Sequence, residues 1–218
     1  MFHREIGLAD GALLPHGKAM ADSIPRDDLT AIAADLWVQL ERGKADRKSP
    51  WHTPVVGTAD GDLRIMVLRH VDPAAGGLRF HTDARSPKVA ILAANPSATI
   101  LFYDPAAKLQ LRCTGTARIA ASDAATDAAW AASTTASRRC YLAPIAPSSA
   151  APAPTSGLPP AFDNRLPSLA ESEAGRIHFA TLTVTLDRID WLYLAHDGHR
   201  RALFERSGDH WSAGWLVP

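Results

Sequence analysis

The sequence feature that most restricts the fold is an aliphatic run at residues 63–71, LRIMVLRHV. Its apolar side chains alternate onto both faces, with Leu63, Ile65 and Val67 on one face and Met66 and Leu68 on the other. A strand with this pattern is expected to be covered on both sides. Arg64 and Arg69 interrupt the run, and a charge on a covered strand is costly unless an opposite charge meets it. The run therefore predicts a bound anion beside these arginines.

The segment that follows adds further groups suited to an anion. A turn rich in Pro and Gly leads from the run into a second short strand at 78–82, and a helix is expected to start after Ser86. Ser86 suits the N-cap, Pro87 suits the first helical position, and Lys88 falls in the first turn. Because a helix start collects unpaired N–H groups, Ser86 and Lys88 form a candidate anion site that Arg64 also faces.

The rest of the chain predicts a mainly β fold with flanking helices (α+β), in one domain at 23–218. An amphipathic helix opens after Ser23 with Asp27 and Asp28 in its first turn, and an Asp60-Gly61 turn joins the strand at 51–58 to the aliphatic run. An Ala-rich helix anchored by Trp130 is expected at 122–136, and the Pro-rich loop at 144–168 excludes regular structure. Further strands are predicted at 99–103, 109–119, 179–186, 189–194, 199–205 and 211–217. Residues 1–22 are expected to be a mobile extension, with Met20 as an alternative start.

Composition narrows the class of function. The 23 basic and 23 acidic residues cancel, so no charged face argues for nucleic acid or an anionic membrane as partner. No apolar run reaches the about 20 residues that span a bilayer. The two cysteines, Cys113 and Cys140, stand apart as expected of reduced thiols in a cytoplasmic protein. A soluble role with a small molecule is the expectation.

Familiar catalytic and metal-binding patterns are missing from the sequence. His196 and His199 lie three residues apart, but no carboxylate-bearing ligand set accompanies them, so no metal is predicted. No Ser-His-Asp arrangement, phosphate-binding loop or GxGxxG motif is found. Any chemistry is expected to come from an organic cofactor.

A series of short motifs resembles the pyridoxamine 5'-phosphate oxidase-like flavoproteins. The motifs are Arg64-Ile-Met-Val-Leu-Arg69, Phe80-His-Thr82, Ser86-Pro-Lys88, Asn95-Pro96, Gln110 with Gly115, Trp191, His199-Arg-Arg201 and Trp211. The resemblance implies an antiparallel split β-barrel that forms a homodimer, with FMN at the subunit interface. It implies that Arg64 and Lys88 bind the FMN phosphate with Thr82 and Ser86 nearby, and that Gln110 bonds the ring edge.

The resemblance extends to further contacts. The backbone at Val67 and Leu68 would run along the flavin, Arg69 and His81 would lie beside it, and Trp191 and Arg201 would close the site from the partner subunit. Candidate substrate contacts are Arg69, Arg138, Tyr141 and His199. Arg201 near the pyrimidine end of the ring would stabilise the anionic reduced flavin.

Three departures from the family pattern bear on the substrate. Arg69 replaces a substrate-binding Lys, Pro87 replaces a second phosphate-site Arg, and Asp197 replaces an Arg that holds the substrate phosphate. An acidic group at that last position repels a phosphate dianion. The sequence therefore predicts an FMN-dependent oxidoreductase of a small molecule other than pyridoxamine phosphate. Two alternatives stay open, a flavin-binding carrier or stress-related protein without turnover, and the same barrel with deazaflavin or haem.

Overall fold

One antiparallel sheet of ten strands organises the chain in the computed structural model, which describes residues 4–6 and 26–218. The strands follow the order β1-β10-β9-β8-β7-β6-β2-β3, and β5 joins β4 to the first half of β8. Their bounds are β1 Arg4–Ile6, β2 Val55–Thr58, β3 Leu63–Ile65, β4 Leu68–Asp72, β5 Gly77–Asp83, β6 Ser97–Asp104, β7 Leu109–Ala120, β8 Phe179–Tyr193, β9 Arg200–Ser207 and β10 His210–Leu216. The curled sheet with helices on its outside confirms the predicted mainly β, split-barrel class.

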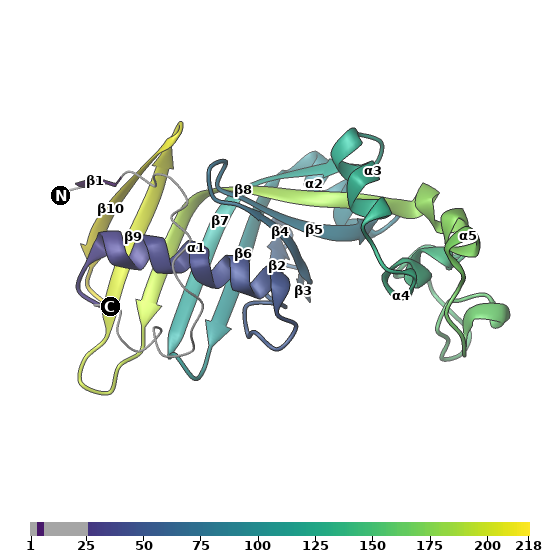
Figure 1. Cartoon of the computed structure of the whole chain (residues 1–218), viewed down its shortest axis with the longest axis horizontal. Helices are drawn as coiled ribbons and strands as arrows, with labels where there is room; N and C mark the ends of the chain where they lie inside the picture. Colours follow the sequence, from purple (N-terminus) through teal and green to yellow (C-terminus); the bar gives the residue numbers. More distant parts are fainter. Residues whose placement is uncertain (1–3, 7–25) are drawn as a thin grey trace.

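Strand β8 connects the two halves of the molecule (Figure 1). Two separate strands were expected at 179–186 and 189–194, but the structure has one continuous strand of 15 residues. Its first half pairs with β5 and its second half with β9, while β7 follows it along most of its length. The Thr-rich apolar alternation continues through Asp187 and Arg188, which are exposed, so the two charges do not end the strand.

The aliphatic run at 63–71 is not one covered strand. It splits into β3 and β4, with Met66 and Val67 between them, because Met66 N–H bonds back to Pro54 O at 3.0 Å and Leu68 N–H to His52 O at 2.9 Å. The Asp60-Gly61 hairpin is confirmed, with Val55 opposite Ile65 and Gly57 opposite Leu63. Leu68 is fully buried, whereas Leu63 and Ile65 are 66% and 70% exposed. The expectation of cover on both faces is therefore wrong for a single chain.

Helix α1, Leu29–Ala45, packs across the sheet (Figure 1). It begins later than expected, because Asp28 is its N-cap and accepts hydrogen bonds from the N–H groups of Thr30 and Ala31. Ile32, Leu36 and Leu40 are buried as the helical spacing predicts. The segment at 23–25 and most of the predicted extension at 1–22 lie outside the described residues, although Arg4–Ile6 pairs with β10.

The second helix starts where the sequence placed it. Helix α2, Pro87–Ala94, has Ser86 as its N-cap, Pro87 at its first position and Asn95 as its C-cap. Its short length and fixed start hold Lys88 beside the end of β5.

A helical lobe lies between the end of β7 and the start of β8 (Figure 1). The expected helix at 122–136 is two helices, α3 Ala124–Ala131 and α4 Thr135–Arg138, with Asp123 and Thr134 as separate N-caps. They are followed by η1 Arg139–Leu142, η2 Pro160–Phe162, α5 Leu169–Ser172 and η3 Glu173–His178. Trp130 is the buried anchor as predicted, with Tyr141 packed edge-on and Phe179 tilted against it.

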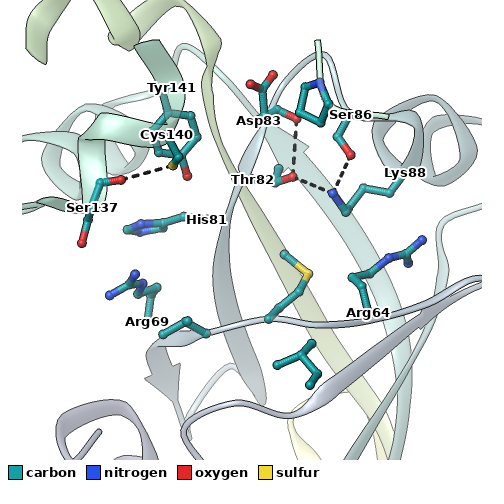
Figure 2. Close-up of a pocket in the computed structure, with 14 residues that line it drawn as sticks. Arg64, Arg69, His81, Thr82, Asp83, Ser86, Lys88, Ser137, Cys140 and Tyr141 are labelled. Carbon is teal, nitrogen blue, oxygen red and sulfur yellow. Dashed lines mark hydrogen bonds between the residues drawn. The ribbon is translucent and has the colours of Figure 1, made fainter. Parts of the chain in front are cut away.

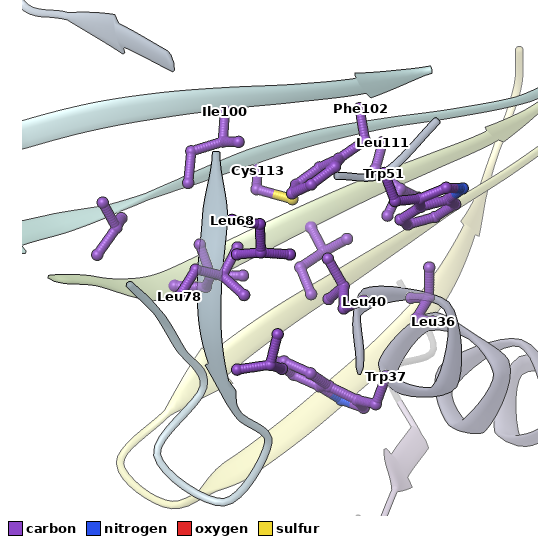
Figure 3. Close-up of a cluster of buried hydrophobic side chains, with 14 of the residues drawn as sticks. Leu36, Trp37, Leu40, Trp51, Leu68, Leu78, Ile100, Phe102, Leu111 and Cys113 are labelled. Atoms are coloured by element: carbon purple, nitrogen blue, oxygen red, sulfur yellow. The ribbon is translucent and has the colours of Figure 1, made fainter. Parts of the chain in front are cut away.

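The main core lies between the curled sheet and α1 (Figure 3). Trp51 stacks on Phe102 at 5.5 Å between ring centroids, and Trp37 meets Trp211 edge-on at 6.2 Å. Cys113 belongs to this core, and burial raises the pKa of its thiol to about 12, so it is a packing residue. Within the described part of the chain, no helix is long and apolar enough to cross a membrane.

Candidate functional site

A cavity of 340 Å³ opens where the β3–β4 junction, β5, the start of α2 and the helical lobe meet (Figure 2). Different groups of side chains line its two ends, and each end carries at least one cation. The lining residues are Arg64, Ile65, Met66, Val67, Arg69, His81, Thr82, Asp83, Ser86, Lys88, Ser137, Cys140, Tyr141 and Pro147.

One end of the cavity is a cluster of cations and hydroxyl groups. Lys88 Nζ donates to Ser86 Oγ at 2.5 Å and to Thr82 Oγ1 at 3.3 Å. Thr82 and Ser86 are buried, and they come from the end of β5 and the N-cap of α2. Burial lowers the pKa of Lys88, and the nearby charge of Arg64 lowers it further. No carboxylate among the described residues lies within ion-pair distance of Lys88, although the charges of Asp83 and Asp62 act on it from further away. Both of these carboxylates are paired with arginines, Asp83 with Arg85 and Asp62 with Arg64.

Arg64 lies beside this cluster but is partly engaged elsewhere. Its guanidinium donates to Thr58 Oγ1 at 3.0 Å and pairs with Asp62, which is largely exposed. Both partners come from the β2–β3 hairpin, so the turn that the sequence predicted also orients this arginine. An anion bound in the cavity would share the guanidinium with Asp62.

The opposite end carries Arg69, His81 and Tyr141. Burial, together with the charges of Arg69 and Arg79, lowers the pKa of His81 to about 4, so the imidazole is neutral at neutral pH. The His81 ring meets Phe179 edge-on at 4.8 Å, which fixes its orientation. Burial raises the pKa of Tyr141, so its hydroxyl stays protonated.

Asp83 and Arg85, which sequence reasoning missed, join the cavity to the lobe. Arg85 binds both carboxylate oxygens of Asp83, at 3.0 and 2.7 Å, and also donates to the carbonyls of Ala143 and Pro144 at 2.9 and 3.2 Å. Burial alone would raise the pKa of Asp83, but the hydrogen bonds from Arg85 outweigh this effect and hold the pKa below its ordinary value. The Asp83-Ala-Arg85 spacing before Ser86 could have indicated the contact between these two residues. The contact of Arg85 with Ala143 could not be seen in this way, because the two residues lie 58 positions apart in the chain.

Several predicted site residues lie outside the cavity. Leu68 is in the core and its N–H is used by His52, so only Val67 of that pair lines the cavity. Trp191 is fully buried in its own chain, which leaves no exposed indole surface for a cofactor in a second subunit. His199 is exposed in the loop between β8 and β9.

Arg138, which was predicted as a substrate contact, is enclosed in the helical lobe. Only 2% of its side chain is exposed, and it donates to the carbonyls of Trp130 and Ala131 and to Ser172 and Glu173. Its guanidinium also lies 4.5 Å from the Trp130 ring centroid. This arginine ties the lobe together and is closed to ligands.

Gln110 and Arg201 share the outward face of the sheet. Gln110 pairs with Leu192 in the strand register, and Leu192 pairs with Arg201, so the three side chains point to the same side. Arg201 donates to Asp190 at 3.1 and 2.7 Å, and Arg112 reaches the same carboxylate at 2.5 Å. Neither Gln110 nor Arg201 lines the cavity of its own chain.

Comparisons with known proteins agree with this architecture. The family model described as pyridoxamine 5'-phosphate oxidase matches residues 51–156. A pyridoxine/pyridoxamine 5'-phosphate oxidase of Sphingopyxis alaskensis is 30% identical over 200 residues, which cover 88% of each chain.

Two solved structures are similar in fold. A pyridoxamine 5'-phosphate oxidase-related, FMN-binding protein from Nostoc punctiforme has a TM-score of 0.67 and 24% identity, over 85% of this chain and 96% of the other. PhzG from Burkholderia lata, solved with tetrahydrophenazine-1-carboxylic acid, has a TM-score of 0.60 and 17% identity, over 92% of this chain and 96% of the other. Because the family model matches and the Sphingopyxis alaskensis relative is 30% identical over 88% of the chain, the chain belongs to the pyridoxamine 5'-phosphate oxidase family.

Proposed function

We propose that the chain binds FMN and acts as an FMN-dependent oxidoreductase on a small molecule other than pyridoxamine phosphate. The observation that carries the proposal is the cluster of Lys88, Ser86 and Thr82 at the start of α2, with Arg64 beside it. Two cations, two hydroxyl groups and a helix N-terminus fit a phosphate monoester. Because the described residues supply no carboxylate partner for Lys88, a phosphate would fill an existing need for negative charge.

The remaining cavity suits the ring system of a flavin. Met66 and Val67 also line the cavity and offer apolar contact and backbone groups. Bound FMN would supply hydride or electron transfer at its ring. The chain's own part would be to orient the ring, to hold the phosphate and to keep the neutral His81 and the protonated Tyr141 beside the site.

The second part of the proposal is a homodimer. Leu63, Ile65, Leu101 and Tyr103 are large exposed apolar residues of β3 and β6, and Ile65 and Leu101 both flank Val55 in the register. An exposed apolar face of this kind marks an interaction surface. Gln110 pairs with Tyr103 in the same register. A second copy packed on this face would place Gln110 and Arg201 toward the partner's cavity, which accounts for their absence from their own.

The substrate is proposed to differ from pyridoxamine phosphate because Asp197 replaces an arginine of the family pattern. Asp197 is exposed in the β8–β9 loop, and no cation among the described residues lies within ion-pair distance of it. Its negative charge disfavours a second phosphate at that place.

The test begins with the absorption spectrum of protein purified without added cofactor, followed by acid release and identification of any flavin. We expect bound FMN, and we expect Lys88→Met to weaken FMN binding about tenfold or more, since one charge-assisted contact to phosphate is lost. Lys108→Met is the matched control on the β6–β7 turn, away from the cavity, and should leave affinity unchanged. A colourless protein that also fails to bind added FMN would contradict the proposal.

Turnover is tested separately on the FMN-loaded protein. Reduction of the bound flavin by a small-molecule donor, followed by reoxidation with an acceptor, would support an oxidoreductase. Stable FMN binding without reduction by any donor tried would favour the carrier alternative. Pyridoxamine phosphate is the control substrate, and we expect it to be inactive.

A further inference from the structure

We call Lys88, Ser86 and Thr82, with Arg64 beside them, the phosphate cluster. The opposite end of the cavity holds a cation that has no partner among the described residues. Arg69 lies on β4, lines the cavity and is exposed, and the described part of the chain gives it neither a hydrogen bond nor an ion pair. Figure 2 shows Arg69 and His81 on the side of the cavity away from Arg64 and Lys88. A guanidinium held at a cavity wall without an anion is an open recognition site for one.

The neighbours of Arg69 determine which anion fits. Arg69, His81, Cys140 and Tyr141 all line the cavity. Burial is the main cause that lowers the pKa of His81, and the charge of Arg69 is the next. The charge of Arg69 also acts on Tyr141 and Cys140, so Arg69 lies near all three groups. All three are uncharged at neutral pH. Asp83 also lines the cavity, but Arg85 binds both of its carboxylate oxygens.

The charges at the two ends of the cavity therefore differ. The phosphate cluster combines Arg64 and Lys88 with two hydroxyl groups. Among the described residues that line the other end, Arg69 is the cation, beside neutral imidazole, phenol and thiol groups, while the charge of Arg79 acts on His81 from outside the lining. One planar guanidinium presents a pair of parallel N–H donors that match the two oxygens of a carboxylate. The single guanidinium in the lining at this end offsets one of the two charges of a phosphate dianion, whereas it matches the one charge of a carboxylate.

From these contacts we infer that Arg69 is a specificity-determining residue that binds a monoanionic carboxylate on the substrate, with the His81 and Tyr141 rings against the substrate body. The inference rests on the proposed function, because it treats this end as the substrate end of an FMN site. It names the substrate class as small carboxylic acids and excludes phosphate esters.

The test is calorimetric titration of the protein saturated with FMN, so that the phosphate cluster is filled. Benzoate, benzamide and phenyl phosphate share one ring and differ only in the attached group. We expect benzoate to bind at least about tenfold more tightly than either of the other two, as one charge-assisted bidentate contact predicts. Equal affinity for benzoate and benzamide, or tighter binding of phenyl phosphate, would overturn the inference.

Substitutions of Arg69 test whether its guanidinium is responsible for benzoate binding. Arg69→Ala should weaken benzoate binding at least about tenfold, and Arg69→Lys should restore part of it, because a lysine keeps the charge but loses the paired donors. The matched control, Arg47→Ala, removes an exposed arginine that does not line the cavity and should change nothing. Unchanged benzoate binding in Arg69→Ala would refute the role of this residue.

A parallel FMN titration separates the two proposals. If Arg69→Ala binds FMN as the parent protein does and loses only benzoate, both proposals stand. If the parent protein binds no FMN, the proposed function fails, and benzoate binding to the unloaded protein still reports on Arg69. If the parent binds FMN but not benzoate, the carboxylate inference alone fails.

Discussion

Arginine side chains at the site have different roles, and burial separates them. Arg69 is exposed and has no partner among the described residues, Arg85 links the cavity to the lobe, and Arg138 is enclosed. In the sequence, all three are basic residues near a proposed site, and nothing local distinguishes them. Their roles follow from which carbonyls and carboxylates the fold places around each guanidinium.

Arg138→Ala should destabilise the protein strongly. The change removes a buried guanidinium together with its hydrogen bonds to the carbonyls of Trp130 and Ala131 and to Ser172. A hydrogen bond to a charged group contributes about 1.5–3 kcal/mol, so the loss of several should cost about 3 kcal/mol or more of unfolding free energy. Urea denaturation measures the difference.

Arg118→Ala is the matched control for Arg138. Arg118 also pairs with a carboxylate, Asp123, but its side chain is 69% exposed. An exposed pair contributes less than about 1 kcal/mol, so this variant should unfold close to the parent protein. If the two variants lost similar unfolding free energy, the contacts of Arg138 would not be what stabilises the lobe.

At the scale of secondary structure, the close pairing of β7 with β8 depends on one glycine. The register shifts between Thr114 and Gly115, and a Cβ at Gly115 would lie 2.1 Å from the backbone oxygen of Thr185. Backbone atoms in a central strand pair cannot move aside as a flexible side chain can. The bulge also bends the two longest strands, which carry the curl of the sheet.

We expect Gly115→Ala to cost about 2 kcal/mol or more in unfolding free energy, since overpacking against backbone forces the strands apart. Gly77→Ala is the control, because the added Cβ would meet only the Asp72 Cβ at an ordinary 3.5 Å. Thermal unfolding monitored by circular dichroism compares the two. A Gly115→Ala protein as stable as the control would show that the strands separate easily at the bulge.

At the scale of the whole molecule, the apolar face of β3 and β6 lies outside the core of its own chain. The core between the sheet and α1 is complete without Leu63, Ile65, Leu101 and Tyr103. The same face carries Gln110 and Arg201, so the proposed dimer would both bury these apolar residues and complete two cavities.

Ile65→Arg should shift the proposed dimer to monomer, because a charge buried without a partner opposes association. Ile177→Arg is the matched control, since Ile177 is 77% exposed on the helical lobe and away from β3. Light scattering coupled to size exclusion gives the mass of each. A monomeric parent protein, or an Ile65→Arg dimer of unchanged stability, would contradict the proposed interface.

The sequence by itself determined the β class, the Asp60-Gly61 hairpin, the start of α2 and the chemistry of the Lys88 cluster. These features are local, because turn residues, caps and apolar spacing act within a few positions of the chain. The tertiary structure decided which groups meet across long separations. It enclosed Trp191 and Arg138, turned Gln110 and Arg201 to the outer face, and joined Arg85 to residues 143–144. Burial and partners depend on strand register and on the lobe's packing, which no local pattern specifies.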